Sequence, residues 1–247
     1  MDADRRWLVD LVRSKRRLLA ITGAGISAES GIPTYRGITG LYASDDGAQI
    51  MRDLSADSLA RRPAQVWTRI QQMADRCRPA RPNPAHLALA LCERWMESVT
   101  IFTQNVDGLH RAAGSRDVVE LHGNLFRQRC DACGHRVELD RTAATEPRAC
   151  PSCEHEMRFD VVLFGELLPE RATERLRRQL TTSVDVCLVV GTTGAFPYVV
   201  GLAQQAAATG AVLVEINLED TPLSPYCARA IRGKAGEVLA PVLELAF

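Results

Sequence analysis

The sequence has no net charge, no long apolar run and no apolar segment at its start. Its 247 residues include 30 basic and 30 acidic side chains, so no overall field draws the chain toward nucleic acid. We therefore expect no specific nucleic-acid partner. No apolar run is long enough to span a bilayer, and the first residues lack the core of a secretory signal. We expect a cytoplasmic location and no membrane partner. The oligomeric state stays open, and a monomer is compatible with this composition.

Eight cysteines without an export signal favour metal binding or burial over disulfide bonds. Four of them form the pairs Cys130-x-x-Cys133 and Cys150-x-x-Cys153, which have the spacing of a zinc ribbon. Four thiolates complete the tetrahedral shell of zinc and leave no position for water, so we predict one structural zinc ion. The other cysteines are expected to be unreactive: Cys77, Cys92, Cys187 and Cys227.

Short apolar runs alternate with helical patterns along the chain. We predict strands at 18–22, 98–103, 117–121, 185–190 and 211–216, and helices at 4–16, 55–77, 84–95 and 236–247. This rhythm indicates an α/β fold with a Rossmann-type, doubly wound parallel sheet. The length leaves room for a second, smaller module that combines the zinc ribbon with helices.

A glycine-rich turn at 22–37 follows the first predicted strand. Gly23, Gly25 and Ala28 fit the pattern G-x-G-x-x-G/A, which suits a tight turn and close backbone approach. Amide hydrogens at the start of the next helix are expected to hold a pyrophosphate, although an ordinary strand-to-helix turn can also carry such glycines. Segments 191–194 and 215–217 end later strands, so we expect them on the same edge of the sheet.

A loop rich in amide and carboxylate groups, 103–110, follows the strand at 98–103. Gln104, Asn105 and Asp107 offer donors and acceptors for a carboxamide and for ribose hydroxyls. A generic polar loop is the alternative interpretation. The position of this loop at the expected ligand edge favours ligand contact.

His122 is the best candidate for a general base among the five histidines. It ends a predicted strand beside Gly123, and imidazole titrates near neutral pH. A packing or capping histidine is the alternative. We expect His86 and His110 on the surface of a helix and a loop, and His135 and His155 outside the ligand set of the zinc.

The chain resembles the sirtuin family over nearly its whole length. The motifs that carry the resemblance occur in the family's order: the glycine-rich turn, the 103–110 loop, His122-Gly123, the cysteine pairs, Phe164-Gly165-Glu166, and the 191–193 and 215–217 segments. The resemblance implies an NAD-dependent protein lysine deacylase. In that chemistry the acyl-lysine oxygen attacks the nicotinamide ribose, nicotinamide leaves, and a histidine helps a ribose hydroxyl to attack the resulting imidate. The products are free lysine and O-acyl-ADP-ribose.

The resemblance also implies the domain boundaries. The NAD-binding domain would be discontinuous and would comprise residues 1–45, 80–128 and 158–247. The small module would comprise a helical part, 46–79, and the zinc ribbon, 129–157. NAD, as a consumed co-substrate, would lie in the cleft between the two.

Site residues follow from the resemblance position by position. The catalytic group would be His122, Asn105 and Asp107. The cofactor would contact Gly23, Ala24, Gly25, Ala28, Glu29, Ile32, Pro33, Thr34, Tyr35, Arg36, Gln104, Asn105, Val106, Asp107, Gly191, Thr192, Thr193, Asn217, Leu218, Glu219 and Ala235. An acyl-lysine protein or peptide, pairing as an added strand, would contact Ile70, Met73, Val162, Phe164, Gly165, Glu166, Gly194 and Ala195.

The sequence departs from the family pattern in two places. Tyr35 stands where the family commonly has Phe, so we expect control of nicotinamide re-entry and hydrolysis to be retained, with the added hydroxyl as a source of altered control. Ala28 and Thr34 resemble the branch that removes acidic acyl groups such as succinyl, but Ile70 and Met73 replace the Tyr-x-x-Arg pair of that branch. A buried carboxylate would then lack its cationic partner, so we expect acetyl or longer apolar acyl groups as substrates.

Three other functions are consistent with parts of this pattern. ADP-ribosyl transfer or NAD hydrolysis would use the same activated sugar with another acceptor. A non-catalytic, NAD-responsive binding module is disfavoured by the zero net charge and by His122. An oxidoreductase is disfavoured because no site for a hydride-transfer substrate is evident.

Overall fold

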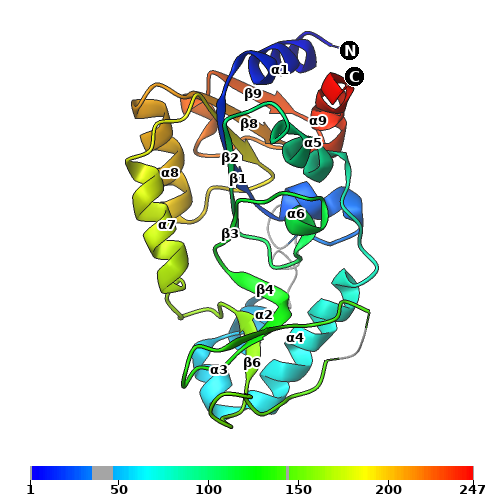
Figure 1. Cartoon of the computed structure of the whole chain (residues 1–247), viewed down its shortest axis with the longest axis vertical. Helices are drawn as coiled ribbons and strands as arrows, with labels where there is room; N and C mark the ends of the chain where they lie inside the picture. The colour runs from blue at the N-terminus through cyan, green and yellow to red at the C-terminus, as the bar shows by residue number, and fades with distance from the viewer. Residues whose placement is uncertain (1, 35–46, 143–144, 247) are drawn as a thin grey trace.

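The computed structural model describes residues 2–34, 47–142 and 145–246. A sheet of six parallel strands forms the larger part, in the order β3-β2-β1-β7-β8-β9 (Figure 1). Its strands are β1 (Arg17–Thr22), β2 (Ser98–Thr103), β3 (Val118–Glu120), β7 (Val186–Val190), β8 (Val212–Asn217) and β9 (Arg229–Arg232). The order reverses beside β1, as in Rossmann-type sheets, whose ligands bind at the carboxyl ends of the strands near that point.

Helices cover both faces of this sheet, as the alternation of buried side chains along β1 requires. Leu18 and Ala20 face a core shared with α1 (Ala3–Ser14), α5 (Pro84–Cys92) and α9 (Ala235–Leu239). Leu19 and Ile21 face a second core shared with α7 (Glu170–Leu180) and α8 (Pro197–Ala208). The doubly wound parallel sheet predicted from sequence is therefore confirmed.

A smaller part extends from the carboxyl edge of the sheet, at the bottom of Figure 1. It holds the antiparallel sheet β5-β4-β6, formed by β4 (Gly123–Arg129), β5 (Arg136–Glu138) and β6 (Arg158–Val161). The helices α2 (Gly47–Asp53), α3 (Ala56–Arg61) and α4 (Pro63–Cys77) accompany it. Val66 and Ile70 of α4 pack with Phe159 in the core of this part.

Several elements differ from the predictions. The helix expected at 55–77 is two helices, because Arg62 has non-helical angles before Pro63, which opens α4. The helix expected at 84–95 ends at Cys92, and the closing segment is α9 followed by the 3-10 helix η3 (Ala240–Ala246). The glycine-rich turn leads into another 3-10 helix, η1 (Ala24–Ser30), instead of an α-helix. Short turns at α6 (Leu109–Ala112) and η2 (Ser224–Tyr226) complete the elements.

Candidate active site

A cleft of about 1060 Å³ lies between the carboxyl ends of the parallel strands and the smaller part. Most predicted site residues line it: Gly23, Ala24, Gly25, Ala28, Glu29, Thr34, Ile70, Met73, Gln104, Asn105, Val106, His122, Val162, Phe164, Gly165, Glu166, Gly191, Thr192, Thr193, Asn217, Leu218, Glu219 and Ala235. Segments that are far apart in sequence thus meet around one space. This is the position that the strand ends predicted.

The remaining predicted residues lie elsewhere. Ile32 and Asp107 line a small neighbouring cavity, which shares Ala24 and Asn105 with the cleft. Pro33, Gly194 and Ala195 are outside the lining of either space among the described residues. Tyr35 and Arg36 fall outside the described residues.

The glycine loop is held against the loop after β7 by backbone contacts. Gly25 N–H donates to the carbonyl of Gly191 at 2.9 Å, and Gly23 N–H donates to that of Val190 at 3.0 Å. A Cβ at Gly25 would lie 2.6 Å from Gly191 Cα, so the close approach made possible here is between two protein segments. The amides of Gly23, Gly25 and Ile26 all donate within the protein, so they do not supply the expected phosphate donors in this arrangement.

His122 is fixed in one tautomer by its neighbours. Its Nδ1 lies 2.9 Å from the carbonyl oxygen of Gln104, which can only accept, so Nδ1 carries the proton. The other nitrogen, Nε2, is then an acceptor, and it lies 2.6 Å from the hydroxyl of Tyr198. Burial lowers the pKa of His122, opposed in part by the hydrogen bond to Gln104. The imidazole is therefore neutral near pH 7, as a general base must be.

A buried polar cluster beneath the glycine loop holds the 103–110 loop. Ser27 Oγ donates to Asp107 Oδ2 at 2.8 Å and accepts from Asn105 Nδ2 at 3.1 Å. Asn105 Nδ2 also donates to the carbonyl of Gly23 at 3.1 Å. Asp107 accepts a second hydrogen bond from Leu109 N–H at 2.8 Å, and burial raises its pKa. Asn105 and Asp107 are thus oriented by direct contact with the glycine loop.

His86 and His110 are buried, and the expectation that they lie at the surface was wrong. Their rings lie 4.9 Å apart between the glycine loop and the sheet. His86 Nδ1 accepts from Asn83 N–H at 3.4 Å, while its Nε2 lies 3.4 Å from Ser27 Oγ. His110 Nε2 lies 2.9 Å from Thr22 Oγ1. These partners serve the capping of α5 and the support of the polar cluster, which a helical pattern in sequence does not show.

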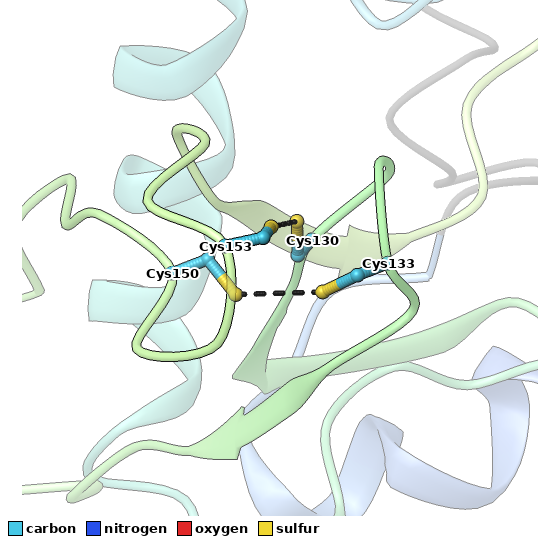
Figure 2. A group of neighbouring side chains, drawn as sticks. All are labelled: Cys130, Cys133, Cys150 and Cys153. Atoms are coloured by element: carbon cyan, nitrogen blue, oxygen red, sulfur yellow. Dashed lines mark hydrogen bonds between the residues drawn. The ribbon is translucent and has the colours of Figure 1, made fainter.

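The four paired cysteines converge on one point, and Figure 2 shows their sulfurs directed toward one another. All four sulfurs lie within 4.8 Å of one another, with 3.4 Å between Cys130 and Cys153 and 3.6 Å between Cys133 and Cys150. Zinc–sulfur bonds of about 2.3 Å at tetrahedral corners place sulfurs about 3.8 Å apart. The donor set and its spacing therefore fit a zinc ion.

Two matching turns present these sulfurs. Gly134 N–H donates to the carbonyl of Cys130 at 2.9 Å, and Glu154 N–H donates to that of Cys150 at 2.9 Å. Both Gly134 and Glu154 have positive φ, 75° and 64°. His155 is exposed, and His135 Nδ1 contacts Ser152 Oγ at 3.1 Å, so neither ring belongs to the cluster.

The end of the cleft beside α4 is apolar. Ile70 and Met73 line it together with Leu54, Leu125 and Leu163. Lys234 is the one cation in the described lining, and it lies beside Gly233 and Ala235, near the residues that end β8 and β9. Glu166, which also lines the cleft, is paired with Arg158 at 2.5 Å.

The segment expected to pair with a peptide already uses part of its main chain. Phe164 N–H donates to the carbonyl of Leu54, and its own carbonyl accepts from Ala56 N–H, both at 2.9 Å. Val162 N–H donates to the carbonyl of His122 at 2.9 Å. An added substrate strand must therefore use other main-chain groups at this edge.

Several residues that line the cleft were missed from sequence. Phe196 and Tyr198 flank Pro197, the first residue of α8, and both line the cleft beside His122. Their position just after a strand-end loop was the available signal. Leu167 lines the cleft and is 92% exposed. Ser27, inside the glycine motif, is buried and lines the small neighbouring cavity.

Fold and site together define a Rossmann-class α/β protein in which a four-cysteine module borders the cleft at the carboxyl edge of the sheet. The profile of the Sir2 family matches residues 23–196, and the chain belongs to this family. The family resemblance deduced from the motifs is thereby confirmed.

Relatives of the chain span nearly the same length. An "NAD-dependent protein deacylase" of Thermus thermophilus is 45% identical over 232 residues, which are 92% of this chain and 89% of that protein. A Sir2 homologue solved as a mutant with ADP ribose has a TM-score of 0.85 at 35% identity, with 99% of this chain and 96% of that chain covered. A Sir2 structure solved with a p53 peptide and NAD has a TM-score of 0.79 at 27% identity, with 100% and 99% covered.

Proposed function

We propose that this protein is an NAD-dependent protein lysine deacylase. The single observation that carries the proposal is His122, a neutral imidazole held by Gln104 at the wall of the cleft that also contains the glycine loop and the apolar end. The names of the relatives, NAD-dependent protein deacylases, support the same activity. The cleft is large enough to take a dinucleotide and an extended side chain together.

NAD would act as a co-substrate that supplies an activated glycosidic bond. Ala24, Ala28 and the 191–193 loop would contact its phosphates and ribose, and Asn217 with Ala235 would border the adenosine. The nicotinamide would lie in the cleft beside Ala24 and Asn105, which also border the small cavity of about 10 Å³ lined by Ile32 and Asp107. Asp107 would accept from the carboxamide. His122 would accept the proton of a ribose hydroxyl, and the acyl group would be transferred to ADP-ribose.

The preferred acyl group would be apolar. Ile70 and Met73 line the cleft, and none of its described lining residues near α4 is a cation. A succinyl carboxylate would lose its hydration there without gaining a charged partner, and this loss costs on the order of several kcal/mol. Acetyl, butyryl and longer apolar chains carry no such cost.

The four cysteines would hold one structural zinc ion. A complete set of thiolates leaves no coordination site for a substrate, so the ion would join the two turns without taking part in chemistry. None of the described residues that line the cleft belongs to the cluster.

Products identified by mass spectrometry test the activity. With NAD and an acetyl-lysine peptide, we expect nicotinamide, deacetylated peptide and O-acetyl-ADP-ribose in equal amounts. His122→Ala should lower product formation by about 10²-fold or more, since general-base catalysis contributes on that order, while NAD still binds. ADP-ribosylated protein or free ADP-ribose as the main product would indicate transfer or hydrolysis instead.

A peptide panel tests the acyl preference. One peptide would carry acetyl, butyryl, myristoyl or succinyl on the same lysine, and kcat/KM would be compared. We expect the succinyl peptide to be at least about tenfold slower than the acetyl peptide, as follows from the loss of a charge partner. Faster succinyl removal would exclude the assignment of Ile70 and Met73, and Met73→Arg should shift the preference toward succinyl.

A further inference from the structure

Tyr198 occupies the basic nitrogen of His122. Its hydroxyl lies 2.6 Å from Nε2, and Nδ1 is committed as a donor to the carbonyl of Gln104. The phenol must therefore donate to Nε2, because a neutral imidazole with a protonated Nδ1 can only accept there. A substrate hydroxyl cannot reach this lone pair directly while the contact persists.

The position of Tyr198 is supported by neighbouring rings. Phe196 stacks on Tyr198 with ring centroids 5.4 Å apart and planes 20° apart. The same Phe196 meets His122 edge-on, at 5.4 Å and 68°. Stacked and edge-on pairs of aromatic rings are favourable beyond the area that they bury. Displacing Tyr198 would disturb its stacking on Phe196 and break its short hydrogen bond to His122.

All three rings face the cleft. Phe196, Tyr198 and His122 are among its lining residues, and Tyr198 is partly buried. A phenol can donate one hydrogen bond and accept another at the same time. The oxygen of Tyr198 therefore has the chemistry to link a hydroxyl in the cleft to Nε2.

We propose that Tyr198 is a further catalytic residue, which receives the proton of the attacking ribose hydroxyl and passes its own proton to His122. This proposal rests on the proposed deacylase function. The ribose O–H bond breaks as its oxygen bonds to the imidate carbon, whose C=N π pair moves to the lysine nitrogen. The hydroxyl proton moves to Tyr198 Oη, and the phenolic proton moves to His122 Nε2. Tyr198 is neutral before and after the transfer, and His122 ends as imidazolium.

The proton transfer through Tyr198 takes place after nicotinamide has left. Loss of the phenol should therefore affect formation of O-acetyl-ADP-ribose but not release of nicotinamide, and the two steps can be measured separately. In rapid-quench single turnovers with NAD and an acetyl-lysine peptide, Tyr198→Phe should release nicotinamide within about twofold of the wild-type rate. Formation of O-acetyl-ADP-ribose should slow by about 10²-fold, the usual scale of acid–base catalysis. Tyr226→Phe is the matched control, because Tyr226 is 62% exposed and lies outside the cleft lining, and it should change neither step.

Solvent isotope measurements add a readout that a packing role would not change. Two protons move together in the wild-type step, so its rate should fall along a curved line as the D₂O fraction rises. Incorporation of 3,5-difluorotyrosine at position 198 keeps the ring but makes the phenol more acidic. Its ionised form cannot donate to Nε2, so product formation should decline at lower pH than in the wild type. This second variant also serves if Tyr198→Phe does not fold.

The outcomes are distinct. Equal or faster product formation by Tyr198→Phe would overturn the relay and indicate that the phenol only blocks the base. Slowing of both steps together would also overturn it, since that result indicates altered binding. If the wild-type protein released no nicotinamide with any acyl peptide, the proposed function itself would fail, whatever the variants do.

Discussion

At the scale of single residues, Gly191 joins the two loops that border the cofactor end of the cleft. It has φ +60°, and a Cβ there would lie 2.4 Å from Ile26 N and 2.6 Å from Gly25 Cα. Gly191→Ala would combine left-handed strain with a backbone clash that no side-chain rotation relieves. We expect a loss of about 3 kcal/mol in the free energy of unfolding, measured by urea titration, and weaker NAD binding by calorimetry.

Gly210 provides the matched control for this substitution. It also has positive φ, +98°, but a Cβ there would meet nothing within 4 Å. Gly210→Ala should cost only the conformational strain, about 1 kcal/mol, and leave NAD affinity unchanged. Equal losses in the two variants would show that the loop contact at Gly191 contributes little.

For single residues, the sequence predicted part of the site and missed another part. Gly23, Gly25 and His122 were placed in the cleft from motif and strand position, and the structure lines the cleft with them. Their roles toward NAD stay predictions. The burial of His86 and the contact from Tyr198 to His122 could not be predicted, because each depends on a partner 59 or 76 residues away.

At the scale of elements, the two cysteine turns should behave as one unit that depends on metal. Cys133→Ser would remove one thiolate, so the cluster could no longer fill the tetrahedral shell of zinc. We expect bound zinc to fall from about one ion per chain, measured by plasma mass spectrometry, and the melting temperature to fall. A chelator should produce the same fall in the unaltered protein.

Cys227→Ser is the control for the cysteine turns, because Cys227 lies in a different core and outside the cluster. Its zinc content should stay at the unaltered level. Full zinc content and stability in Cys133→Ser would contradict a four-thiolate site. If the protein stayed folded and active after zinc removal, the zinc ion would contribute to stability and not to activity.

Helices and strands could be predicted from sequence where the local pattern of apolar residues agrees with the burial of the element. The strands β1, β2, β7 and β8 are short, mostly apolar and buried on both faces over most of their length, so their sequences suffice. Strands β4 and β6 pair with a register shift between Asn124 and Gln128, and β6 has only four residues. Irregular pairing of this kind is fixed by tertiary contacts, which no local period records.

At the scale of the whole molecule, the buried pair His86–His110 should make stability depend on pH. Burial lowers the pKa of His86 to about 4 and that of His110 well below its usual value. His110 Nδ1 has no hydrogen-bond partner among the described residues, so nothing there favours a charged ring. The pair joins α6 to β1 through the contact of His110 with Thr22, and α5 to η1 through the contact of His86 with Ser27.

The direction of the pH dependence depends on whether the folded or the unfolded state binds more protons. Between about pH 6.5 and pH 4 the unfolded chain protonates both rings, while the folded protein leaves them neutral. Stability therefore falls as pH drops through this window, by up to about 1.4 kcal/mol per pH unit for each ring. Urea titrations at pH 7, 6 and 5 should show the fall, with little change above pH 7.

His86→Gln separates this effect from general acid sensitivity. The substitution removes one titrating ring, so the fall in unfolding free energy between pH 6 and 5 should become shallower by up to about 1.4 kcal/mol. The variant should nevertheless be less stable at pH 7, because Asn83 N–H and Ser27 lose a partner fitted to imidazole. If the unfolding free energy of this variant fell between pH 6 and 5 as steeply as that of the unaltered protein, other groups would govern the acid response. Folding would then not lower the pKa of His86.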